Sequence, residues 1–275
     1  MRNVTMYCLC IHNKVLPVMK KLDYIPVGLG NDKFSDEWLR DNTNENISSK
    51  NKYYSEYSFH YWFWKNVLPK IEDNHWVGFC AYRRYWCNKE KFAHDSIIDE
   101  LAVKIDDVVI KDIPDEWKKF DTVVGEHHYI NNLKLTKLIK RGLWSLIRNP
   151  SALFKSKRNI RFHFDMWHGN GILDKAIDLL DDKDREDFRK YTRENVSFFR
   201  GNMFVCRSKE IMNNYYCSLF PWLKRCEKSF GFNLENYETR MYAFLAERYQ
   251  SFWFTKYTKP LLWPVIFYDI TKTIK

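Results

Sequence analysis

Two neighbouring arginines, Arg83 and Arg84, have the type and position that point most directly to chemistry. They follow the apolar run at residues 76–82 (WVGFCAY), which is typical of a buried strand. A guanidinium group is planar and stays charged at every relevant pH, so two of them at a strand end suit the oxygens of a pyrophosphate. Pairing with acidic side chains elsewhere in the chain explains the same residues equally well, and the sequence leaves both interpretations open.

A second polar cluster lies at residues 41–51 (DNTNENISSKN). Ser48 or Ser49 is well placed to cap the helix that follows, and capping needs no ligand. The segment is also rich in uncharged hydrogen-bonding groups and contains Lys50, a composition that would suit a sugar or a nucleobase. Capping is the simpler interpretation, and the binding role is the alternative.

Ionisable residues further along the chain give weaker signals. His163 and His168 are five residues apart, so on a helix they diverge, and a metal site with Asp165 is not favoured. Glu247 and Arg248 lie in a strongly apolar helix, where an ionisable pair is costly unless it is satisfied. An internal salt bridge is the structural explanation for that pair, and Glu238 with Arg240 repeats the pattern.

Several common motifs are missing from the sequence. It contains no G-x-x-x-x-G-K-[ST], no G-x-G-x-x-G after a strand, no G-x-S-x-G and no H-E-x-x-H. The usual nucleotide hydrolase, dehydrogenase, esterase and zinc-protease functions therefore lack support.

The elements that must position these side chains alternate between strand and helix. Strands are predicted at residues 4–11, 24–29, 76–82 and 121–124, and a helix with an aromatic face is predicted from residue 48 to 68. Residues 99–107 look helical, residues 202–205 form a strand-like run, and a last helix is expected at 237–252. This order favours a parallel α/β sheet, in which ligands bind beyond the carboxyl ends of the strands, where the two arginines would lie.

Composition sets the protein class. The chain has 275 residues, of which 45% are hydrophobic, and it has few glycines and prolines, which excludes disordered and collagen-like proteins. Seven cysteines without a C-x-x-C pair indicate reduced, mostly buried thiols and no zinc ribbon. No apolar run is long enough to span a bilayer and no signal sequence is recognised, so we expect a cytoplasmic protein.

Residues 133–162 differ from the rest of the chain in charge. They hold nine Lys or Arg and no Asp or Glu, interleaved with apolar residues such as Trp144 and Phe154, within a chain of net charge +10. Such a basic amphipathic segment is typical of a surface that meets anionic lipid. A solvated basic helix pair packed on the domain is the plainer alternative.

These motifs together resemble a bacterial family catalogued as domain of unknown function 4422. Its pattern is D-x-x-x-x-N-I-S-x-K-N, Y-W-x-W-K-N, H-Y-R-R-Y, a His followed by an L-D pair, N-M-F and F-L-x-E-R. The positions that match are Asn46, Ile47, Ser48, Lys50, Asn51, Tyr61, Trp62, Trp64, Lys65, Asn66, Tyr82, Arg83, Arg84, Tyr85, His168, Leu173, Asp174, Asn202, Met203, Phe204, Phe244, Leu245, Glu247 and Arg248. The sequence departs from the pattern at Ala81, where the family has His, and at Ile172, where it has an acidic residue.

The resemblance implies a fold and an activity. Family members occur in capsule and lipopolysaccharide assembly, and some resemble galactofuranosyltransferases that use UDP-galactofuranose. The implied fold is α/β and GT-A-like, with a mostly parallel sheet flanked by helices and an elaborated helical C-terminal half. We expect a single glycosyltransferase domain, with the nucleotide-sugar site in residues 1–125 and the acceptor part, including the basic segment, in residues 126–275.

The resemblance also implies roles for individual residues. Donor-binding residues are expected to be Asn46, Ser48, Lys50, Asn51, Tyr82, Arg83, Arg84, Tyr85, Asn202 and Arg248. For an inverting transfer, Glu247 is the expected general base, with Glu238 and His168 as alternatives, and His168 and Asp174 are expected to bind the acceptor. The arginines occupy the place where such enzymes usually carry Asp-x-Asp, so no metal is expected to be required, although a divalent ion such as Mn²⁺ remains compatible.

Two classes of function are therefore weighed. The first is a glycosyltransferase that moves a sugar, with galactofuranose as one option, from a UDP-sugar donor to a lipid-linked glycan at the inner face of the membrane. The second is a non-enzymatic protein that binds a membrane surface or nucleic acid through its positive charge. No RNP, helix-turn-helix or zinc-finger pattern supports nucleic acid, so no nucleic-acid partner is expected.

Overall fold

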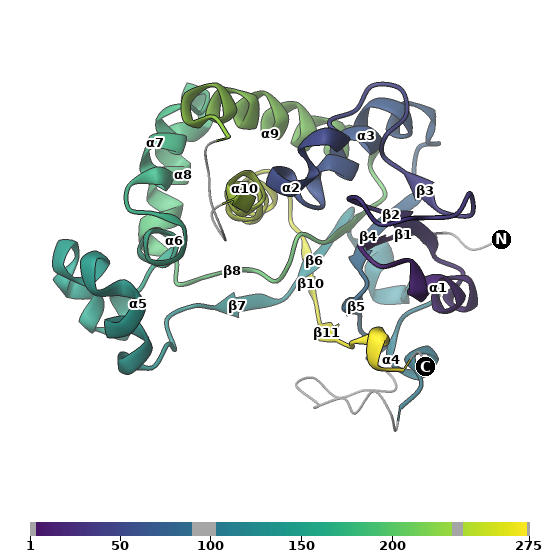
Figure 1. The fold of residues 1–275 in the computed structure, drawn as a ribbon, viewed down its shortest axis with the longest axis horizontal. Coiled ribbons are helices and arrows are strands. Elements are labelled where there is room, and N and C mark those ends of the chain that lie inside the picture. Colours follow the sequence, from purple (N-terminus) through teal and green to yellow (C-terminus); the bar gives the residue numbers. More distant parts are fainter. Residues whose placement is uncertain (1–3, 90–102, 233–238, 274–275) are drawn as a thin grey trace. The chain divides into compact units, whose positions relative to one another are not determined.

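The computed structural model describes residues 4–89, 103–232 and 239–273, and its contacts divide the chain into two compact units (Figure 1). The first unit contains Met1–Glu126, Arg200–Tyr216 and Tyr257–Lys275. The second contains His127–Phe199 and Cys217–Lys256. The chain therefore passes from one unit to the other four times, and the first unit is built from three separate stretches of sequence.

The first unit is built around a sheet that has nine strands among the described residues. The order along its main path is β10-β6-β9-β4-β1-β2-β3, and β5 pairs with β4 and β11. The strands are β1 (Val4–Cys10), β2 (Ile25–Gly28), β3 (Leu39–Arg40), β4 (Trp76–Ala81), β5 (Arg84–Trp86), β6 (Thr122–Gly125), β9 (Phe204–Cys206), β10 (Leu261–Trp263) and β11 (Val265–Phe267). The helices are α1 (Leu16–Leu22), α2 (Asn51–Tyr54), α3 (Tyr57–Asn66) and α4 (Ile105–Val108).

Strand directions agree with the predicted fold class. The pairs β1–β2, β1–β4, β2–β3 and β6–β10 are parallel, and β9 runs antiparallel to both β4 and β6. Helices pack on both faces of this sheet: on β1, Tyr7 contacts Phe59 and Phe63 of α3, whereas Met6 and Cys8 share a core cluster with residues of α1. The mixed α/β fold with a mostly parallel central sheet flanked by helices is thus confirmed.

The second unit is mainly helical. It contains α5 (Leu135–Arg148), α6 (Ile160–His168), α7 (Ile172–Asp178), α8 (Asp182–Glu194), most of α10 (Met241–Tyr257) and the second part of α9 (Lys209–Phe230). A two-stranded antiparallel sheet joins β7 (His127–Tyr129) to β8 (Ser197–Phe199). Aromatic side chains fill the core between α8, α9 and α10, where Trp222 and Phe188 contact Tyr249.

The predicted aromatic helix is wrong in its continuity, and its predicted face is only partly buried. The backbone turns sharply at Ser55, with φ 48° and ψ −130°, so α2 ends at Tyr54 and α3 starts at Tyr57. Of the predicted face, Tyr54, Tyr57 and Leu68 are buried, whereas Tyr61 and Trp64 are only half-buried. On α3 the side chains of Phe59, His60 and Phe63 are fully buried as well. The interruption shifts the helical phase, so a periodicity counted across it finds only part of the buried face.

Other predicted elements are reproduced with shifted ends. The strands near residues 4, 25, 76 and 122 are present, the last helix runs to Tyr257, and the only described helix in the predicted 99–107 region is the short α4. All seven cysteines are free thiols, and all except Cys217 are buried, as predicted. Across the described ranges, no helix is both long and apolar enough to cross a membrane.

Candidate functional site

The two arginines lie in a tight hairpin at the carboxyl end of β4, with Arg83 in the turn and Arg84 at the start of β5. Ala81 pairs with Arg84 across the hairpin, so Tyr82 and Arg83 make the turn itself. The Arg84 side chain is exposed, whereas Arg83 is half-buried and places Nε 3.1 Å from Oδ2 of Asp269. Arg83 therefore has the acidic partner that the structural interpretation expects, whereas Arg84 is exposed, and binding of a pyrophosphate stays a prediction.

The contact with Arg83 also affects the pKa of the Asp269 carboxylate. Its partial burial opposes ionisation, but hydrogen bonds from Thr271 and the charge of Arg83 hold its pKa below the usual value. Asp269 therefore stays charged at neutral pH and fixes the Arg83 guanidinium against the ring of Tyr82, 4.9 Å away.

The two tyrosines of the motif occupy different environments. Tyr85 is fully buried and its hydroxyl donates a 2.8 Å hydrogen bond to the carbonyl of Tyr82, so it supports the turn. Tyr82 is half-buried with its ring 5.2 Å from that of His12, and burial raises its pKa. Tyr82 is thus the motif tyrosine with a surface that a ligand can reach.

The polar segment 41–51 follows β3 at the same edge of the sheet. Asn46 Oδ1 accepts hydrogen bonds from the amide and the hydroxyl of Ser48, at 3.1 and 2.8 Å. Neither the 3-10 helix Ser48–Lys50 nor α2 has a side-chain cap, so the N-cap role predicted for Ser48 or Ser49 is wrong. The Ser48 hydroxyl instead closes a turn with Asn46, and Lys50 lies half-buried beside it.

Asn51 connects this segment to the turn between α2 and α3. Its amide nitrogen donates to the Ser55 carbonyl at 3.0 Å and to the Ser58 hydroxyl at 2.9 Å. A Cβ on Gly30, which follows β2, would lie 3.4 Å from Asn51 Oδ1. The Asn51 side chain therefore lies beside the carboxyl end of β2.

Asn202 reaches the same edge from a distant part of the sequence. It precedes β9, whose antiparallel pairing with β4 brings its amino end to the carboxyl end of β4. Its side chain contacts Glu56 and the hydroxyl of Tyr57, at 3.5 and 3.4 Å. A Cβ on the adjacent Gly201 would lie 3.7 Å from Nη1 of Arg84, so Arg84 and Asn202 belong to one cluster.

The predicted catalytic and acceptor residues lie in the second unit. Arg248 is buried, forms an ion pair with Glu247 and lies 4.3 Å above the ring of Phe198. His168 is buried and stacks on Phe244 at 3.9 Å; burial, together with the positive charge of Arg248, lowers its pKa to about 2. His168 is therefore neutral across the physiological range.

Asp174 is held by arginines of its own unit. Its carboxylate lies 2.6 Å from Arg161, 3.4 Å from Arg193 and 3.9 Å from Arg189. This cluster gives Asp174 a structural role whether or not it binds an acceptor. Glu238, the other predicted base, lies outside the described residues, so its pairing with Arg240 is not described.

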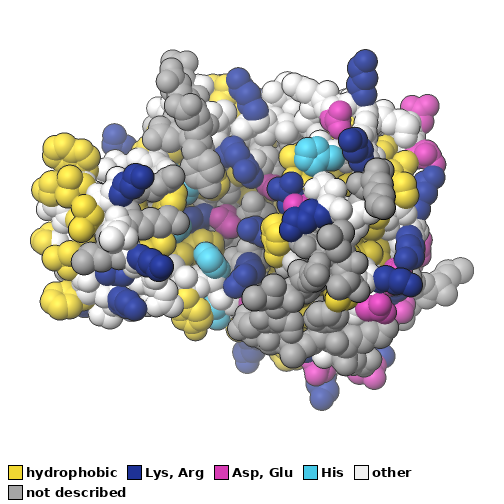
Figure 2. Space-filling model, turned by 60° about the horizontal axis from the view of Figure 1, so that its bottom comes forward, with side chains coloured by type: hydrophobic (Ala, Val, Ile, Leu, Met, Phe, Trp, Pro, Cys, Tyr) yellow, Lys and Arg dark blue, Asp and Glu magenta, His cyan; other side chains and the backbone are white. Residues whose placement is uncertain are grey.

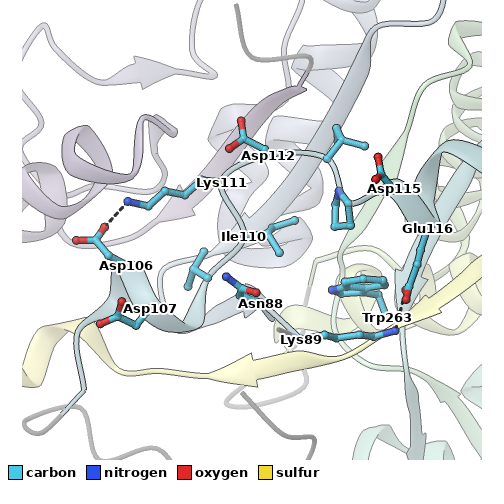
Figure 3. Close-up of a pocket in the computed structure, with 13 residues that line it drawn as sticks. Asn88, Lys89, Asp106, Asp107, Ile110, Lys111, Asp112, Asp115, Glu116 and Trp263 are labelled. Carbon is cyan, nitrogen blue, oxygen red and sulfur yellow. Dashed lines mark hydrogen bonds and ion pairs between the residues drawn. The ribbon is translucent and has the colours of Figure 1, made fainter. Parts of the chain in front are cut away.

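Residues of the first unit also line a cavity of about 720 Å³ (Figure 3). It lies toward the amino ends of the strands, because Tyr24, just before β2, donates a hydrogen bond to the Ile110 carbonyl. Its lysines, Lys89 and Lys111, already lie 3.3 and 2.9 Å from Glu116 and Asp106. Further carboxylates line it at Asp107, Asp112 and Asp115, so its charge disfavours a pyrophosphate.

A different surface is formed by the basic segment in the second unit. Leu138 and Leu146 of α5 pack into a small core with Phe162 and Met166 of α6. Other apolar side chains stay outside that core, and Trp144 and Phe154 are each 71% exposed. Figure 2 shows hydrophobic and basic side chains gathered over the part of the unit that carries α5.

Not every basic residue of this segment belongs to the surface. Arg158 is buried and donates hydrogen bonds to the carbonyls of Asn131, Ala152, Leu133 and Leu153. Arg161 is bound to Asp174. Exposed cations remain at Lys134, Lys140, Arg148, Lys155 and Lys157.

Two acidic residues near the arginine turn, Asp269 and Glu56, were missed by sequence reasoning, whereas Asp41 begins the polar segment that it singled out. Asp269 lies far from Arg83 in sequence, and no local pattern connects them. Asp41 is buried, and its Oδ2 atom has no hydrogen-bond partner among the described residues. Glu56 follows the turn at Ser55, where no Gly, Pro, Asn or Asp signals a break in the helix.

No group of three His, Cys, Asp or Glu side chains suited to a metal ion occurs in the part of the chain that the structure describes. The described residues therefore offer no ready set of metal ligands at the arginine turn. The prediction that transfer does not depend on a metal is left untested by this geometry.

Comparisons with known proteins give two matches. A family model described as domain of unknown function (DUF4422) matches residues 6–259. Among solved structures, the apo structure of the WbbM bifunctional glycosyltransferase matches with a TM-score of 0.65 and 21% identity, over 96% of this chain and 45% of that one. The chain thus spans less than half of that protein's length, and the likeness is one of fold. A comparison with curated proteins finds no match.

Proposed function

The chain belongs to the family described as domain of unknown function DUF4422, and from this premise we propose that it is a glycosyltransferase. It would move a sugar, with galactofuranose as the first to test, from a UDP-sugar donor to a lipid-linked glycan in bacterial surface polysaccharide synthesis. The similarity in fold to a bifunctional glycosyltransferase supports this activity. The observation that carries the proposal is the cationic turn at the carboxyl edge of the parallel sheet, beside Asn51 and Asn202.

The donor diphosphate would bind at this turn. Arg84 is exposed and Arg83 is oriented by Asp269, and in this proposal their guanidinium groups would neutralise the charge that develops on departing UDP. Tyr82, Asn46, Ser48, Lys50 and Asn51 lie at the same edge and would hold the nucleoside and sugar. Because cationic side chains supply the neutralisation, we propose that a metal is not required.

The roles proposed for residues of the second unit rest on the motif match alone. Arg248 with the donor, Glu247 as a base, and His168 and Asp174 with the acceptor remain predictions. The ion pairs and the stacking contact around them give each of these four side chains a structural reason to be where it is. Functional experiments on them therefore need a measurement of stability beside each measurement of activity.

A screen of ligands by thermal unfolding tests the proposed function. UDP at 100 times its dissociation constant would stabilise the folded protein by about 2.7 kcal/mol, because it binds only the folded state. The purified protein should also release UDP from one or more of UDP-galactofuranose, UDP-galactose, UDP-glucose and UDP-N-acetylglucosamine. Stabilisation by oligonucleotides without any response to UDP would instead favour the non-enzymatic polyanion binder.

We also propose that the basic segment attaches the enzyme to the inner face of the membrane. The exposed Trp144 and Phe154 would enter the interface, and the exposed lysines would contribute about 1 kcal/mol each near an anionic surface. Attachment would bring the active site to a lipid-linked acceptor.

Co-sedimentation with liposomes tests this attachment. Binding should need anionic lipid and weaken with salt. Replacing Trp144 and Phe154 by Ser, or Lys134, Lys140, Lys155 and Lys157 by Gln, should reduce it. Arg207→Gln is a matched control, because that arginine pairs with Asp121 in the first unit. Equal binding to neutral and anionic vesicles, or none to either, would refute the attachment.

A further inference from the structure

Glu56 is placed at the donor edge by the direction of α3. This helix lies between β3 and β4 in the chain, and these strands run parallel to each other within the sheet. A helix in such a crossover returns antiparallel to the strands, so its first residue lies near their carboxyl ends. Glu56 is the residue that immediately precedes α3.

Contacts confirm this position. Oε2 of Glu56 lies 3.5 Å from the amide nitrogen of Asn202, in the same cluster as Arg84. Burial raises the pKa of Tyr82 in the arginine turn, and the charges of Asp269 and Cys10 and, least of all, of Glu56 act in the same direction. Glu56 is thus a carboxylate that contacts Asn202 in the cluster of Arg84, and it reaches this cluster from the start of α3.

The backbone before Glu56 is held in an unusual conformation. Ser55 has φ 48° and ψ −130°, a region that residues with a side chain rarely adopt. Its carbonyl accepts hydrogen bonds from Asn51 Nδ2 at 3.0 Å and from the Ser58 hydroxyl at 3.1 Å. Residues around the turn therefore fix where α3 begins, and with it the direction of the Glu56 side chain.

Other carboxylates of this edge have different surroundings. Asp269 is paired with Arg83, and the side chain of Asp41 is buried. Glu45 is exposed and accepts a 2.7 Å hydrogen bond from the Tyr61 hydroxyl. Glu126, which follows β6, is partly exposed and lies 3.8 Å from Arg200, whereas Glu56 combines partial exposure with a contact to Asn202 beside Arg84.

We propose that Glu56 is the general base of the transfer, an assignment that rests on the proposed function. Its carboxylate would take the proton from the acceptor hydroxyl as that oxygen forms a bond to the anomeric carbon of the donor sugar. The bond from that carbon to the β-phosphate oxygen breaks, its electron pair stays on UDP, and the arginine turn neutralises the charge. In this assignment Glu56, and not Glu247, does the proton transfer.

Steady-state kinetics with three matched variants test the assignment. UDP release from UDP-galactofuranose and UDP-galactose is measured with octyl β-galactoside and with water as acceptors, and UDP affinity is measured by calorimetry. Glu56→Gln should lower kcat by 100-fold or more while UDP affinity and the unfolding temperature stay close to wild type. It should also remove the acid limb of the kcat/KM profile against pH, and Glu56→Asp should recover part of the activity.

Glu45→Gln is the control, because Glu45 belongs to the neighbouring exposed loop. A residue that only stabilises the start of α3 would change the unfolding temperature and leave the pH profile in place. Turnover of Glu56→Gln within threefold of wild type, or a collapse seen with Glu247→Gln instead, overturns the assignment and leaves the proposed function intact. A wild-type protein that neither binds UDP nor releases it from a donor overturns both.

Discussion

The arginine turn of the first unit and the Glu247–Arg248 pair of the second unit match the same family pattern but differ in what surrounds them. At the turn, Arg84 is exposed and Arg83 is only half-buried. In the second unit, Arg248 is buried with an acidic partner and an aromatic ring against it. A motif match therefore marks positions that a family retains, and burial and partners are needed to separate ligand-binding residues from those that hold the fold.

The largest expected effect is on stability, at Arg248. Arg248→Ala leaves the Glu247 carboxylate without its partner in a mostly buried environment, and should lower the free energy of unfolding by about 3 to 5 kcal/mol. Urea denaturation measures it. Arg240→Ala is the control, because that arginine is exposed. If the Arg248→Ala protein is stable but no longer binds UDP, then Arg248 binds a ligand as the arginine turn is proposed to do. That result would support a donor role for Arg248.

Arg84 should show the opposite behaviour. Arg84→Ala should weaken UDP binding by about 1.5 to 3 kcal/mol, the usual loss for a charged hydrogen bond, with little change in unfolding temperature. Arg83→Ala should lose less UDP affinity, because Asp269 already shares its guanidinium. Isothermal calorimetry with UDP measures both. A folded double variant with normal UDP affinity would rule out the arginine turn as the diphosphate site.

We expect acid to lower the stability of both units, through one buried histidine in each. Burial lowers the pKa of His60 to about 3, and burial with the charge of Arg248 lowers that of His168 to about 2, so both are neutral when folded. The unfolded chain takes up these protons below about pH 6.5, so stability falls with pH by about 1.4 kcal/mol per unit for each histidine.

Unfolding measured between pH 6 and pH 4.5 tests this expectation. His60→Leu and His168→Leu should each remove the slope of one proton. Stability that falls equally steeply in both variants would show that other groups cause the acid sensitivity.

The smallest expected effect is that of metal chelation on the rate of UDP release. If the arginine turn neutralises departing UDP, EDTA should leave the rate of UDP release within about twofold of its value without EDTA. Loss of activity that manganese restores would contradict this, and would direct attention to carboxylates such as Asp41, which lies at the same edge.

Hydrophobic patterning predicted the sheet because β1 and β4 are continuous apolar runs that can only be buried between helices. The hydrophobic pattern also located the arginine turn, because a strand ends where its apolar run ends. The Ser55 turn could not be predicted, because its conformation depends on hydrogen bonds from Asn51 and Ser58 that form only in the folded chain. The same holds for the Arg83–Asp269 pair, which joins residues that come together through the pairing of β5 with β11.

Strand β9 has a consequence for how the protein is synthesised. It lies between β4 and β6, and β10 then covers the far side of β6, yet both are translated after most of the second unit. While the ribosome makes residues 127–199, β4 and β6 have no strand between them, and their apolar edges are open to other chains. We therefore expect the nascent first unit to depend on chaperones until β10 emerges and completes its sheet.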